Sequence, residues 1–136
     1  MDKLRWFIAV AGFAFFILSG PPAQAADRVF ELRTYTAHPG KFEAMKARFK
    51  NHVVPLFEKH GMTVVGFWFA ADEPRSENTL AYVLAYPSRE AAKKSWDGFR
   101  SDPERTKVWA ETEKDGPINL KVESMYLAPA DFSRIK

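Results

Sequence analysis

The 136-residue sequence contains no cysteine, and its seven glycines are isolated from one another. Without cysteine the chain can form no disulfide, thiolate nucleophile or iron–sulfur cluster, and it lacks the usual structural zinc ligands. Isolated glycines leave no glycine-rich loop that could hold a phosphate. The net charge is only +3 and the basic residues are scattered, so no nucleic-acid partner is expected. Apolar residues make up 46% of the sequence, and this fraction together with the length predicts one compact domain.

Residues Met1 to Ala25 have the three parts of a secretory signal peptide. A short basic start precedes an apolar run from Trp6 to Leu18, and Ala23-Gln24-Ala25 is a small-residue cleavage pattern. The run of about 13 residues is shorter than the roughly 20 that span a bilayer. We therefore expect export to the periplasm or the medium, no stable membrane insertion after cleavage, and one domain over residues 26–136. An uncleaved N-terminal anchor is the alternative.

The domain begins with a strand pattern followed by a helix pattern. Residues 28–36 alternate with period two and predict a strand, whereas residues 42–60 carry apolar side chains at helical spacing. Pro55 removes a backbone donor inside this helix and predicts a kink or a restart near Val54. Gly61 is expected to end the helix.

The second half of the domain predicts a hairpin, a divided helix and a last strand. The apolar run 62–71 is typical of a strand covered on both faces, and it pairs with a strand over 79–86. Ser88 and Asp102 are expected helix caps, the latter followed by a proline at the first helical position. The remaining expected elements are helices over 89–101 and 103–114 and a strand over 119–127.

The predicted order is strand, helix, strand, strand, helix, strand. This order is typical of an α+β, ferredoxin-like βαββαβ sandwich, in which the helices cover one face of a four-stranded antiparallel sheet. The other face would leave apolar strand residues open to water. Helices on one side cannot cover all the apolar side chains of the strands, which include Tyr35, Val65, Phe67, Phe69, Val83 and Met125. Because a soluble monomer rarely exposes such a patch, we expect a homodimer paired through its sheets.

Five short motifs follow one another along the domain: E-L-R-T-Y-T at 31–36, P-G-K at 39–41, G-F-W at 66–68, A-Y at 85–86 and S-D-P-E at 101–104. Their order and spacing resemble the NIPSNAP family of the dimeric α/β-barrel superfamily, over about Val29 to Leu127. The sequence departs from the family pattern at Arg105, where an aromatic residue often follows Asp-Pro-Glu. The resemblance implies a ferredoxin-like subunit in a dimeric α/β barrel. It implies little about chemistry, because better-known members are interaction proteins and related families include haem-degrading and cofactor-free monooxygenases.

The first predicted strand carries Glu31, Arg33 and Tyr35 at a spacing of two residues, so all three point to one face. A guanidinium beside a phenol can hold a small anionic or polar ligand. The alternative is an ion-pair network of Glu31 and Arg33 with Glu123 or Lys121, or a contact across the dimer. Both interpretations make this face the first place to look for a site.

Trp68 and His60 are the other candidate ligand-binding residues. Trp68 could belong to an aromatic pocket, or the aromatic residues could form the core instead. The other members of such a pocket would be Trp96, Trp109, Tyr82 and Phe99. His60 ends the first helix, where the helix dipole favours a cation, and an axial haem role for His52 or His60 is the alternative.

The sequence shows no catalytic arrangement. No Ser-His-Asp set is readable, and the three histidines are too dispersed to supply the three or four ligands of a metal site. We therefore expect a homodimeric module that binds a small molecule or a protein partner, without a cofactor or catalysis of its own. The alternative is a small cofactor-free or haem-handling monooxygenase.

Overall fold

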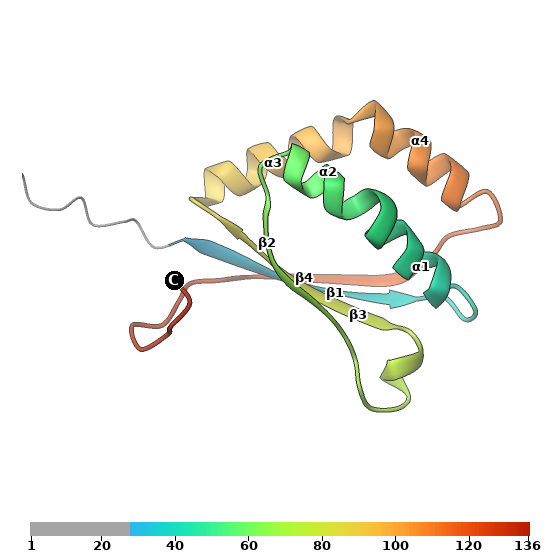
Figure 1. Cartoon of the computed structure of the whole chain (residues 1–136), viewed down its shortest axis with the longest axis horizontal. Helices are drawn as coiled ribbons and strands as arrows, with labels where there is room; N and C mark the ends of the chain where they lie inside the picture. The colour runs from blue at the N-terminus through green and yellow to red at the C-terminus, as the bar shows by residue number, and fades with distance from the viewer. Residues whose placement is uncertain (1–27) are drawn as a thin grey trace, which may run out of the picture.

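The computed structural model describes residues 28–136, and the predicted signal peptide at Met1 to Ala25 lies outside this range. The elements follow the predicted order (Figure 1). The strands are β1 (Val29–Ala37), β2 (Thr63–Phe69), β3 (Thr79–Tyr86) and β4 (Asn119–Leu127). The helices are α1 (Phe42–Arg48), the π-helical segment η1 (Phe49–Val53), α2 (Val54–Lys59), the 3-10 turn η2 (Arg75–Glu77), α3 (Arg89–Ser101) and α4 (Pro103–Thr112). Within residues 28–136, no helix is long and apolar enough to cross a membrane.

The strands form one antiparallel sheet in the order β2-β3-β1-β4. β1 lies between β3 and β4, so that Glu31 pairs with Leu84 on one side and with Tyr126 on the other. The helices α1 to α4 all lie on the same side of this sheet (Figure 1). The predicted α+β ferredoxin-like fold is therefore confirmed.

The helical region after β1 restarts at Val54, as predicted. α1 runs into η1, and Pro55 occupies one of the first two positions of α2, where a missing backbone N–H costs little. Gly61 follows α2 with a φ of 73°, a left-handed conformation that favours glycine. Pro55 and Gly61 thus mark the beginning and the end of α2.

Ser88 and Asp102 cap α3 and α4. Each side-chain oxygen accepts a hydrogen bond from a backbone N–H in the first turn of its helix, which satisfies a donor that the helix itself leaves free. α3 has the predicted bounds. α4 ends at Thr112 rather than at the predicted Lys114, because the chain has already left the helix to turn through Gly116 at a φ of 102°.

The core lies between the helices and the face of the sheet that carries Tyr35. The buried residues of β3 on this face are Leu80, Tyr82, Leu84 and Tyr86. Tyr35, Phe67 and Phe69 lie on the same face, where their rings contact Phe49 or Phe42 of the helices. Of the six apolar strand residues, these three thus lie on the face that the helices cover. The strand register, which the sequence alone does not give, places them towards the helices.

β2 is covered on one face only, which contradicts the expected burial on both faces. It is an edge strand, and its register with β3 shifts between Val64 and Gly66. Phe67 packs against the core, whereas Trp68 points to the opposite face and is 53% exposed. The long apolar run therefore serves two surfaces, only one of which is covered by helices.

The sheet face opposite the helices, which we call the outer face, is apolar in part, and it also carries the exposed ion pair of Lys121 and Glu123. Its exposed large side chains are Val65, Trp68, Met125 and Leu127. A groove of about 500 Å³ lies on this face, lined by Phe30, Val65, Trp68, Val83, Leu127 and residues of the C-terminal segment 128–135. The described chain thus leaves an extended apolar surface on the side that has no helices.

Candidate functional site

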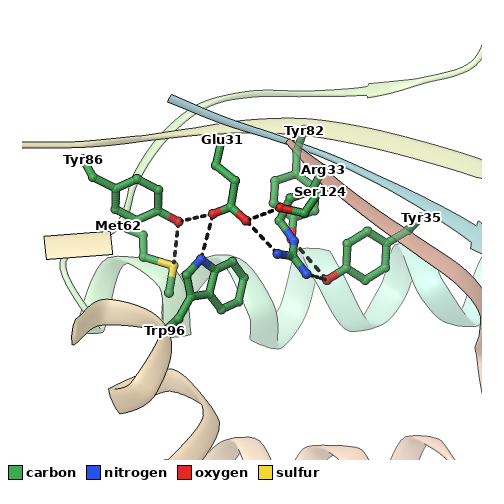
Figure 2. A network of polar contacts seen from close by, with 8 residues as sticks. All are labelled: Glu31, Arg33, Tyr35, Met62, Tyr82, Tyr86, Trp96 and Ser124. Carbon is green, nitrogen blue, oxygen red and sulfur yellow. Dashed lines mark hydrogen bonds and ion pairs between the residues drawn. The ribbon is translucent and has the colours of Figure 1, made fainter. Parts of the chain in front are cut away.

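Glu31 lies at the centre of a hydrogen-bond network between the sheet and the helices (Figure 2). Its side chain is 1% exposed and accepts four hydrogen bonds. Ser124 Oγ and Arg33 Nη1 donate to Oε1 at 2.6 and 2.7 Å. Tyr86 OH and Trp96 Nε1 donate to Oε2 at 2.8 and 2.7 Å. The carboxylate therefore ties β1 to β3, β4 and α3.

The network keeps Glu31 ionised. Burial alone would raise the pKa of Glu31, but the hydrogen bonds from Ser124, Arg33 and the two aromatic donors hold this pKa below its usual value. Burial and the nearby charge of Glu31 raise the pKa of Tyr86, so Tyr86 remains a phenol that donates. Glu31 is thus an ionised acceptor at neutral pH, and its oxygens are already occupied. This arrangement suits a structural anion better than a general base.

Arg33 extends the network towards Tyr35 and Trp96. Its Nη2 donates to Tyr35 OH at 3.2 Å, and Tyr35 OH accepts a further hydrogen bond from Tyr82 OH at 3.3 Å. The guanidinium carbon of Arg33 lies 4.4 Å from the ring centroid of Trp96, a cation–π contact. Three of the five candidate residues, Glu31, Arg33 and Tyr35, are therefore brought together in one network.

A groove of about 390 Å³ opens between α3 and β4 beside this network. We call it the α3–β4 groove, and its lining residues are Arg89, Glu90, Lys93, Trp96, Arg100 and Tyr126. The guanidinium carbon of Arg89 lies 3.4 Å from the ring centroid of Tyr126, and that of Arg100 lies 5.4 Å from Trp96. Trp96 connects the groove to the network through its bond to Glu31. The groove thus combines surplus positive charge with aromatic walls.

Trp68 and His60 lie apart from this network. Trp68 is on the outer face of β2, and the aromatic residues with which it could have formed a pocket belong to the core or pack against it. His60 ends α2, and its Nε2 lies 2.7 Å from Asp102 Oδ2 at the start of α4. Lys121 and Glu123, the alternative partners expected for Glu31, pair instead with each other at 2.8 Å.

Tyr86 and Ser124 are the members of the network that sequence reasoning missed. Both are strand residues, and the A-Y motif that contains Tyr86 gave no indication of a role in a site. Only the pairing of β1 with β3 and β4 brings their hydroxyls to Glu31. The one signal in the sequence was the inward-facing Glu31 itself, because a buried carboxylate requires donors on neighbouring strands.

The contact of Asp102 with Lys59 and His60 predicts a pH-dependent stability. Lys59 Nζ at 2.8 Å and His60 Nε2 at 2.7 Å hold the pKa of Asp102 far below its usual value. Because the folded state lowers this pKa, the stabilisation is present above the unfolded value of about 3.9 and is lost as the pH falls towards the folded value. Asp102→Asn keeps a helix cap but removes the charge. In urea unfolding, we expect the stability advantage of wild type over Asp102→Asn to shrink from about pH 6 to about pH 2.5.

Asp131→Asn makes the same change of charge in the exposed C-terminal segment and serves as the control. Its unfolding free energy should follow that of wild type across this pH range. A constant difference between wild type and Asp102→Asn would show that the ionised carboxylate does not contribute to stability.

Among residues 28–136, no group of three or more His, Asp or Glu side chains is placed to hold a metal ion. The described network therefore consists of a buried carboxylate, guanidinium groups and aromatic rings. Chemically, it can orient an indole and a guanidinium at the wall of the α3–β4 groove.

Solved structures share this fold at low sequence identity. A NIPSNAP family protein with unknown function from Agrobacterium tumefaciens str. C58 has a TM-score of 0.69 and 20% identity, over 82% of this chain and 96% of that protein. An uncharacterized NIPSNAP-like domain protein from Burkholderia xenovorans has a TM-score of 0.68 and 16% identity, over 79% and 90%. A putative antibiotic biosynthesis monooxygenase from Chloroflexus aurantiacus J-10-fl has a TM-score of 0.51 and 17% identity, over 80% and 99%. These likenesses establish the fold.

A comparison with curated proteins finds no match. The family model described as NIPSNAP matches residues 30–134, which include every strand and helix of the described structure except the first residue of β1. Sequence and fold therefore agree, and the chain belongs to the NIPSNAP family.

Proposed function

We propose that this protein is an exported homodimer that binds a small organic anion in the α3–β4 groove and does not transform it. The observation that carries this function is the charge of the groove. Arg89, Lys93, Arg100 and Glu90 line a cavity of about 390 Å³. Asp97 of the same helix pairs with Lys93 and Arg100, so three cations meet two carboxylates and one positive charge is left over. A volume of this size suits a small molecule, and the surplus positive charge favours an anion.

The aromatic residues of the groove favour a planar ligand. Trp96 cannot turn freely, because Glu31 holds its N–H and Arg33 lies against its ring. Tyr126 meets Arg89 at the other side of the groove. A flat ligand with a carboxylate can meet a guanidinium and an aromatic edge at the same time. The network around Glu31 then serves to position Trp96 rather than to react.

The homodimer is supported by the outer face. Trp68 and Met125 are each more than half exposed there, next to the groove lined by Phe30 and Leu127. Covering this face with the same face of a second copy removes both apolar surfaces from water in a closed symmetric assembly. Export is supported by the signal-peptide pattern of Met1 to Ala25.

Native mass spectrometry of the protein purified after export tests assembly and binding in one spectrum. We expect a dimer that adds one benzoate per subunit and does not add benzamide, which has the same shape without the charge. The Arg89→Gln, Arg100→Gln double variant should lose the benzoate adduct, because it removes two of the three cations of the groove. Lys94→Gln, on the same helix but outside the groove, should keep it.

A monomer would overturn the proposed assembly. Equal addition of benzoate and benzamide, or no benzoate adduct, would overturn the anion-binding groove. Oxygen-dependent turnover of an aromatic substrate, followed with an oxygen electrode, would replace the binding function with that of a small monooxygenase.

A further inference from the structure

Two arginines at the far end of the helix layer lie against the indole of Trp109. Arg48 is the last residue of α1, and Arg105 lies in the first turn of α4. Their guanidinium carbons are 4.4 and 4.2 Å from the ring centroid of Trp109, which follows Arg105 by one helical turn. We call Arg48, Arg105 and Trp109 the arginine clamp.

Arg48 is fully buried, with 0% of its side chain exposed, and it retains a free donor. Its Nη1 donates to Glu113 Oε1 at 2.7 Å, and its Nη2 donates to Asn119 Oδ1 at 3.1 Å. Its Nε is buried and has no acceptor among residues 28–136. Nearly all buried donors in folded proteins are hydrogen-bonded, so this N–H indicates a position for an acceptor from outside the chain.

Arg105 has fewer hydrogen-bond and ion-pair partners than Arg48. Its Nε is also buried without an acceptor, and within residues 28–136 no carboxylate forms an ion pair with it. Burial and the positive charge of Arg48 together lower the pKa of Arg105. A nearby anion would stabilise the charged guanidinium of Arg105, because its attraction would offset both the lost hydration and the repulsion from Arg48.

The charges of the arginine clamp do not balance. Glu113 pairs with Arg48, so within residues 28–136 the guanidinium of Arg105 is left without an ion-pair partner. A water molecule could accept a hydrogen bond there but could not neutralise that charge, whereas a phosphate dianion would overcompensate it. A carboxylate supplies one negative charge and two oxygens that match the N–H pairs of a guanidinium.

The geometry points to the arginine clamp as a second binding site, which takes a small monocarboxylate. The site is separate from the α3–β4 groove. Asn119, which contacts the clamp, and Tyr126, which lines the groove, lie at opposite ends of β4, about 23 Å apart at the usual rise of a strand.

Isothermal titration of the full chain with butyrate and with butyramide tests this site. We expect butyrate to bind and butyramide, which has the same size and no charge, not to bind. Arg105→Gln should weaken butyrate binding by about tenfold or more, because it removes the unpaired guanidinium. Arg105→Lys, which keeps the charge but not the planar fork, should give an intermediate loss.

Arg75→Gln is the matched control, because Arg75 is exposed in η2 and the variant loses the same charge. It should retain wild-type affinity to within about twofold. The Arg89→Gln, Arg100→Gln variant should also retain butyrate binding, which separates failure of this site from failure of the groove. Absent butyrate binding, equal binding of butyramide, unchanged affinity in Arg105→Gln, or tighter binding of inorganic phosphate would each overturn the proposal.

Discussion

Glu31→Gln should lower the free energy of unfolding by about 3 to 5 kcal/mol, the usual cost of removing one partner from a buried ion pair. The substitution keeps the shape of the side chain but replaces one oxygen with an NH₂ donor. Arg33 donates to one oxygen and Trp96 to the other, and neither N–H can reverse its direction as a hydroxyl can. Either orientation of the amide therefore sets a donor against a donor. Urea unfolding at neutral pH and one protein concentration measures the loss.

Glu123→Gln is the matched control for this measurement. Glu123 pairs with Lys121 on β4, and both side chains are more than half exposed. Exposed pairs contribute roughly 0 to 1 kcal/mol, so this variant should unfold almost as wild type does. A Glu31→Gln variant as stable as Glu123→Gln would show that the buried network contributes nothing to the fold.

Phe57→Ala should destabilise the protein to a similar extent, by about 3 to 5 kcal/mol. Phe57 is 1% exposed, and its ring centroid lies 5.2 to 5.6 Å from those of Phe99, Tyr82 and Trp96. Removing the ring leaves a cavity between α2, α3 and β3 that these large neighbours cannot readily fill. Urea unfolding gives the loss directly.

Phe69→Ala removes the same side chain from a more exposed position, on β2, and provides a graded comparison. Phe69 contacts Phe42 but is 54% exposed. Its ring therefore buries less apolar surface in the folded state than the ring of Phe57, and its removal costs less stability. We expect less than half the loss seen for Phe57→Ala. Equal losses would mean that burial does not decide the contribution of these rings.

The sequence predicted the elements well where local chemistry decides them. Ser88, Asp102, Pro55 and Gly61 act through their own hydrogen bonds or dihedral angles, so a linear sequence is enough to place them. The burial of β2 was predicted wrongly because it depends on strand order. An apolar run can belong to a central strand or to an edge strand with one uncovered face, and composition does not distinguish the two.

The sequence predicted the part of the candidate site that lies on β1, but not the residues that other strands contribute. Period two placed Glu31, Arg33 and Tyr35 on one face, and the structure brings them together. The donors from Tyr86 and Ser124 depend on register across three strands, which no local pattern contains. His60 was expected at a helix end and lies there, but its partner Asp102 comes from α4.

The pairing of β1 with β4 has a consequence for how the chain reaches its native state. Phe30 pairs with Leu127, so one side of the first strand is completed only by a strand that comes after all the helices in the chain. The β2–β3 hairpin and α3 precede this strand in the chain and close over short separations. Contacts between distant segments slow folding, because a long loop must close before they form. The buried charge of Glu31 therefore depends for one of its four donors, Ser124, on a contact that spans 93 residues of the chain.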